Sequence, residues 1–210
     1  MKKDKGVALL DWAYKTALNG IPMVSEPLND FVNGYIEKYG RTEKAIDKMV
    51  AAQKMKCATT GFLTGLGGLI TLPVTLPTDL ASSLYMQVRM IVSIAMLRGY
   101  KVNDDEVKSL VFLCLVGNAV GDVLKNAGIK GVQQFAAKKL LPLLTKELVV
   151  KINQTVGFKL LAKGGSKGLV NAGKVIPVLG GIVGGVWNYS EVHIYAKLAK
   201  KMFNENFQAE

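Results

Sequence analysis

The sequence is poor in the residues that most catalytic and metal sites require. It has one histidine, His193, and two cysteines among 210 residues. A single histidine excludes His-rich metal sites and leaves any serine or cysteine nucleophile with one candidate base. No G-x-S-x-G or H-E-x-x-H motif occurs, and GGSKG at 164–168 lacks the spacing of a phosphate loop, so we interpret it as a flexible linker. We therefore expect a non-enzyme without a metal or a cofactor.

Disulfide and secretion signals are also scarce. Cys57 and Cys114 lie in apolar, helix-like segments, where buried free thiols are the expected state. The N-terminus begins with basic residues, but Asp11 and Lys15 interrupt any hydrophobic signal region, and no small-residue cleavage site follows. The sequence thus predicts a cytoplasmic protein, which could also lie on the inner face of the cell membrane.

Arginine is rare although the formal net charge is +11. The positive charge is concentrated between Lys125 and Lys174, where ten lysines accompany one acid, Glu147. Lysine lacks the planar fork that reads bases, and a nucleic-acid reader usually shows more arginine and exposed aromatic residues. Anionic lipid headgroups need neither, so we expect membrane lipid rather than specific nucleic acid as the partner. The candidate membrane-surface residues are Lys138, Lys139, Lys146 and Lys151.

Strand signals are scarce, and apolar residues recur at helical spacing throughout. In the first half of the chain, the expected helices cover 5–19, Leu28 to Gly40, a segment from Thr42, and a core helix from Thr75 or Thr78 to Arg98-Gly99. In the second half, one helix runs from the capping box Asn103–Glu106 to Ala127-Gly128, two helices cover 129–163 and are divided near Pro142, and a last helix begins near Val175. The pattern predicts an all-α, single-domain bundle of about seven to nine helices. Residues 1–40 should form short helices that pack on a helical domain at 41–210.

Glycine-rich segments without charge predict closely packed core helices. Gly61-x-x-x-Gly65, and two such spacings between Gly180 and Gly185, leave little side chain to separate neighbouring backbones. Pro73 and Pro77 restrict the first segment to about 15 helical positions, fewer than the roughly 20 that a bilayer crossing needs. We expect core helices or a half-inserted hairpin here. The predicted core comprises Gly61–Gly99, Leu110–Val120 and Val175–Trp187.

Several polar residues interrupt the apolar segments, where an unpaired charge would cost several kcal/mol. The candidate ligand-binding cluster is Asp79, Arg89, Asn118, Asp122, Asn188 and His193. One interpretation is structural, with helix caps and an ion pair such as Asp79 with Arg89 across two helices. The other is a polar patch at the end of an apolar cavity that contacts a lipid headgroup or a hydrophobic ligand.

Two blocks resemble the hallmark blocks of the EcsC family. They are GFLTGLGGLITLPVTLPTDLASSLYMQVRMIVSIAMLRGY, followed by an acidic helix start, and IPVLGGIVGGVWNY near the end. The resemblance spans Thr42 to Phe203 and implies a bacterial, mostly helical protein of a family named from a gene beside an ABC transporter. It supplies no catalytic residues. Three functions stay open: a lipid-binding or hydrophobic-ligand-binding domain, which we favour, an accessory protein of a membrane transporter or of secretion, and a hydrolase.

Overall fold

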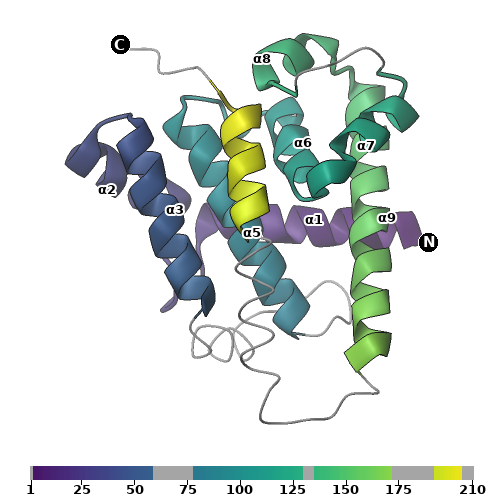
Figure 1. Cartoon of the computed structure of the whole chain (residues 1–210), viewed down its shortest axis with the longest axis horizontal. Helices are drawn as coiled ribbons and strands as arrows, with labels where there is room; N and C mark the ends of the chain where they lie inside the picture. Colours follow the sequence, from purple (N-terminus) through teal and green to yellow (C-terminus); the bar gives the residue numbers. More distant parts are fainter. Residues whose placement is uncertain (1, 59–77, 130–134, 172–191, 205–210) are drawn as a thin grey trace.

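The computed structural model describes residues 2–58, 78–129, 135–171 and 192–204 (Figure 1). Within these ranges every regular element is helical, and the β-type pairing is one isolated bridge between Ile21 and Ser25. The elements are α1 (Lys2–Asn19), α2 (Leu28–Tyr39), α3 (Glu43–Ala58), α5 (Thr78–Leu97), α6 (Asp105–Cys114), η1 (Gly117–Ala119), α7 (Val120–Ala127), α8 (Ala137–Leu140), η2 (Leu141–Leu143), α9 (Lys146–Asn171) and a C-terminal helix over 192–202. The prediction of an all-α single domain is confirmed.

Helix α1 lies across the other long helices rather than beside them (Figure 1). It packs on α9 near its beginning and on α5, and its apolar face carries Leu10, Ala13 and Ala17, all of which are fully buried. These side chains belong to the same hydrophobic core as those of α5 and α6. The N-terminal helix is therefore an integral part of the core.

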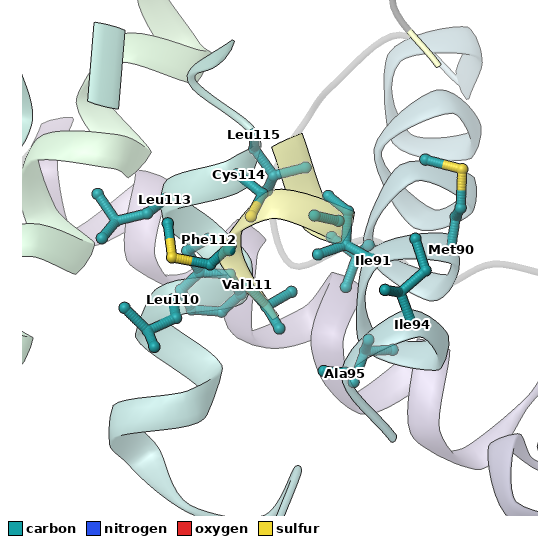
Figure 2. Close-up of a cluster of buried hydrophobic side chains, with 14 of the residues drawn as sticks. Met90, Ile91, Ile94, Ala95, Leu110, Val111, Phe112, Leu113, Cys114 and Leu115 are labelled. Carbon is teal, nitrogen blue, oxygen red and sulfur yellow. The ribbon is translucent and has the colours of Figure 1, made fainter. Parts of the chain in front are cut away.

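Helices α5 and α6 both contribute buried side chains to the core. Figure 2 shows Ile91 of α5 on the side of that helix toward the run from Leu110 to Leu115, and these side chains are buried, as are Met90 and Ile94 of α5. This confirms the predicted core in the described part of α5 and at 110–115, whereas residues 116–119 of the second predicted segment are half-buried or exposed. The glycine-rich residues 61–77 and the segment Val175–Trp187 lie outside the described residues.

Several helix boundaries follow the sequence signals. Thr42 caps α3, because its Oγ1 accepts a hydrogen bond from the backbone N–H of Ala45 at 3.2 Å. The glycines at 20, 99 and 128, which have φ values of +75°, +82° and +105°, follow the ends of α1, α5 and α7 as predicted. Local cap and stop residues thus determine these ends.

The long helix predicted from the capping box Asn103–Glu106 is wrong in two respects. The residue that precedes the first turn of α6 is Asp104, and its side chain makes no capping hydrogen bond. The helix then ends at Cys114, and η1 separates it from α7. Gly117 adopts φ +57°, a left-handed conformation that a continuous α-helix does not contain.

The linker predicted at 164–168 is also wrong, because α9 continues to Asn171. Each helical glycine costs about 1 kcal/mol relative to alanine, but extending an existing helix avoids the cost of a new nucleus. No proline occurs between Pro142 and Pro177 to stop the helix. The predicted division near Pro142 is confirmed, since α8 and η2 precede α9 there.

The C-terminal helix is attached to α3 and to the end of α5. Lys200 forms ion pairs with Asp47 and Glu43 of α3, and Arg98 also pairs with Glu43. The ring of Phe203 meets that of Tyr100 edge to face, with 5.2 Å between the ring centroids. These contacts join the end of the chain to its first half.

The turn between α1 and α2 carries a strained residue. Met23 has φ +63°, and its side chain is 99% exposed. Replacing Met23 with glycine should raise the free energy of unfolding by roughly 0.5 to 1 kcal/mol, because glycine adopts this conformation without a steric penalty. Thermal melts would measure the gain. Met23→Ala is the control, since alanine shortens the side chain but keeps the strain, and equal melting of the two variants would contradict the explanation.

Candidate functional site

Arg89 is buried in the middle of α5 and binds three neighbouring segments. Its Nη1 donates to the carbonyl of Ala17 at 2.9 Å, and its Nη2 donates to the carbonyl of Glu26 at 2.7 Å. The guanidinium lies over the ring of Phe31, 4.9 Å from the centroid, and the residue is only 3% exposed. Arg89 therefore fastens the end of α1, the following turn and α2 to the core.

Tyr85, one helical turn before Arg89, holds the same turn. Its hydroxyl is hydrogen-bonded to Ser25 Oγ at 2.6 Å, and Ser25 Oγ also accepts from the backbone N–H of Ile21 at 2.9 Å. Fully buried Tyr85 and buried Arg89 share one face of α5, because four residues complete about one turn. The hydrogen bonds of Tyr85 and Arg89 explain why a hydroxyl group and a charged group interrupt the apolar helix α5. Both residues have a structural role, because they hold the turn between α1 and α2 against α5.

The ion pair predicted between Asp79 and Arg89 across two helices is wrong. Both residues belong to α5, ten positions apart, which corresponds to about 15 Å along the helix axis. The side chain of Asp79 and the whole of Asn188 lie outside the described residues. Arg89 uses backbone carbonyls as its partners instead.

The other members of the predicted cluster are exposed and lie on neighbouring elements. Asn118 belongs to η1, Asp122 to α7, and His193 to the C-terminal helix. These elements are close together, because a Cβ added to Gly117 would lie 3.7 Å from the ring of Tyr195. The structure thus separates buried Arg89 from three exposed polar residues, whose binding role stays a prediction.

Cys114 is fully buried, which confirms it as a free buried thiol, and Cys57 has no described side chain. Burial raises the pKa of the Cys114 thiol, so the folded protein keeps it protonated and unreactive. The unfolded thiol ionises above about pH 8.5 while the folded thiol stays protonated, so the free energy of unfolding decreases as the pH rises past that value.

A Cys57→Ser variant should therefore resist thiol-labelling reagents at pH 8 until denaturant unfolds it, when one thiol should react. Mass spectrometry of the labelled protein provides the measurement. Rapid labelling of the native variant would show that Cys114 is accessible and would contradict the buried, protonated state.

Four lysines predicted to contact a membrane surround the corner between α8 and α9. Lys138 and Lys139 lie on α8, and Lys146 and Lys151 lie on the first turns of α9. Figure 1 shows α8 near this N-terminal end of α9. All four side chains are exposed, and we call this surface the lysine face. Glu147 is the one acid between Ile129 and Ala162. The lysine face therefore carries a local excess of positive charge.

Buried apolar residues hold the lysine face in place. Leu140 and Leu144 anchor the corner, and Val149 and Ile152 anchor the start of α9. Thr145 caps α9 by accepting from the N–H of Leu148 at 3.4 Å, and a hydrogen bond from its side chain lowers the pKa of Glu147. The corner is thus a defined part of the fold and not a loose basic loop.

Apolar side chains are also exposed on η2 and α9, and the lysine pattern of the sequence does not reveal them. Leu143 of η2 is 46% exposed, and Val150 of α9 is 55% exposed. The helical spacing does indicate that Val150 is exposed. Val149, Ile152 and Val156 face the buried side of α9, and Val150 lies on a different side of the helix. A surface that combines lysines with exposed aliphatic side chains can bind both parts of a lipid interface.

Two kinds of site are absent from the described ranges. None of the helices there has both the length and the apolar composition needed to span a bilayer. In the same part of the chain, no group of three or more His, Cys, Asp or Glu side chains could hold a metal ion.

Comparison with known proteins identifies one family. The model of the EcsC protein family matches residues 26–205, which confirms the resemblance inferred from the glycine- and proline-containing blocks and extends it to α2. No curated protein and no solved structure matches the chain significantly.

Proposed function

The chain belongs to the EcsC protein family, and we propose that it is a non-enzymatic domain that binds anionic lipid on the cytoplasmic surface of the cell membrane. The observation that supports this function is the lysine face, where four exposed lysines lie on α8 and α9 and exposed Leu143 lies on η2 between these helices. One acid, Glu147, interrupts the positive charge.

Electrostatic attraction is strong enough for reversible attachment. Each lysine near an anionic bilayer contributes about 1 kcal/mol, so the four lysines together could hold the domain at the surface with about 4 kcal/mol. Lysine suits this task because it interacts with phosphate groups as a point charge and needs no fixed geometry. The attraction falls off within a Debye length of about 8 Å at physiological salt, so binding should depend strongly on ionic strength.

A flotation experiment with two matched variants tests the proposal. The first variant changes Lys138, Lys139, Lys146 and Lys151 to glutamine. The control changes four exposed lysines elsewhere, namely Lys15, Lys48, Lys101 and Lys197, and so removes the same net charge. We expect the first variant to lose most of its flotation with vesicles that contain anionic lipid, and the control to lose little.

Equal losses in both variants would mean that net charge alone causes binding and would contradict a specific lysine face. If the folded wild-type protein fails to float at all, a protein partner, such as a membrane transporter, replaces lipid as the proposal. A turnover that His193→Ala abolishes without unfolding the protein would support the hydrolase alternative instead.

A further inference from the structure

The outer face of α9 exposes two large apolar side chains along the helix. Phe158 is 48% exposed and Val150 is 55% exposed, and they are separated by two helical turns. Gln154 lies midway between them and Ala162 one turn further on, so the residues at this four-residue spacing share one side of the helix. This side carries uncharged residues except Glu147 and Lys151.

Basic residues border this outer face. Lys146 lies at its beginning on one flank, and half-buried Lys159 lies on the other flank beside Phe158. Long lysine side chains can extend toward phosphate groups while their stems cover apolar surface. A helix that exposes both apolar and basic side chains and buries its opposite side can lie in the plane of a bilayer surface.

Resting on the proposed function, we infer that α9 lies along the surface of an anionic bilayer and inserts Phe158, Val150 and Leu143 between the lipid headgroups. The lysines favour an anionic surface as the occupant of this face, and the exposed side chains of Val150 and Phe158 fit a lipid interface. Attachment then has a salt-sensitive part from the lysines and a salt-resistant part from the inserted side chains.

Tryptophan fluorescence with vesicles of equimolar phosphatidylcholine and phosphatidylglycerol tests the insertion directly. Phe158→Trp should show blue-shifted emission on binding and should be quenched by phosphatidylcholine that carries bromine on its acyl chains. Asn33→Trp, at an exposed position of α2, is the control and should add no quenching to that of native Trp12 and Trp187.

Partitioning of two serine variants tests the same inference without a probe. Phe158→Ser should bind these vesicles about tenfold more weakly, since the exposed part of the ring no longer leaves water. Met55→Ser is the matched variant, because Met55 is an apolar residue of α3 that is 75% exposed. Figure 1 shows α3 on the opposite side of the molecule from α9. It should bind like the wild type.

The possible failures are distinguishable. If the protein floats at low salt while Phe158→Trp shows no additional quenching, lipid binding stands and the inserted α9 is wrong. If Met55→Ser weakens partitioning and Phe158→Ser does not, the end of α3 faces the bilayer and the inference is overturned. If the folded protein does not bind at low salt, both the proposed function and the inference fail.

Discussion

A Gly157→Ala variant is expected to lose about 3 kcal/mol or more of its free energy of unfolding, which is large for the addition of one methyl group. Gly157 of α9 and Gly6 of α1 are buried where the two helices cross. A Cβ built on Gly157 would lie 2.6 Å from the carbonyl carbon of Gly6, and one built on Gly6 would lie 2.5 Å from that of Gly157. Both contacts are with backbone, so no side-chain rotation can relieve them.

Gly34→Ala is the matched control for this prediction. Gly34 lies within α2, and a Cβ added there would meet no atom within 4 Å. Alanine should therefore stabilise the protein by about 0.5 to 1 kcal/mol, because it restricts the unfolded chain and favours the helix. Denaturant unfolding of both variants would show shifts of opposite sign. A Gly157→Ala protein as stable as the wild type would disprove the close crossing of α1 and α9.

The second large effect is expected from Arg89→Leu, with a loss of about 2 to 4 kcal/mol. Leucine would leave the carbonyls of Ala17 and Glu26 without their guanidinium donor and would remove the stacking on Phe31. Arg89→Lys should recover only part of the loss, because an ammonium group lacks the fork that reaches both carbonyls.

Exposed Arg41 provides the control for Arg89. It also donates to backbone carbonyls, those of Met96 and Leu97, but at 3.2 and 3.4 Å and near solvent. Arg41→Leu should change stability by less than about 1 kcal/mol. Limited proteolysis offers a second readout, since Arg89→Leu should expose the turn between α1 and α2 to cleavage. Similar stability losses in both variants would contradict the anchoring role of Arg89.

Much of the helical framework could be predicted because its signals are local. Gly20 and Gly128 mark helix ends by their left-handed backbone, and Thr42 marks a beginning by its side-chain hydrogen bond. Gly117 and the glycines at 164–168 show the limit of such signals. Gly117 interrupts a predicted helix, whereas the glycines at 164–168 lie within α9 where a linker is predicted. Tertiary packing and the propagation of an existing helix decide whether a glycine ends a helix or lies inside one.

The other features depend on contacts between distant parts of the chain. The approach of Gly6 to Gly157 has no signal in either local sequence, since each is a single glycine within a helix. The buried charge of Arg89 predicts an opposite charge such as Asp79 as its partner, whereas carbonyls of α1 and the next turn are its acceptors. Charge alone predicts the four lysines, but the exposure of Leu143 and Val150 is known only from the structure.

The most direct test of lipid binding is flotation of the wild-type protein across a series of salt concentrations. Vesicles that contain phosphatidylglycerol are compared with vesicles of phosphatidylcholine alone. The account predicts flotation with the anionic vesicles at low salt, progressive release as salt screens the lysines, and little flotation with the neutral vesicles. Equal flotation with both kinds of vesicle, or binding by the folded protein that salt leaves unchanged, would contradict attachment through the lysine face.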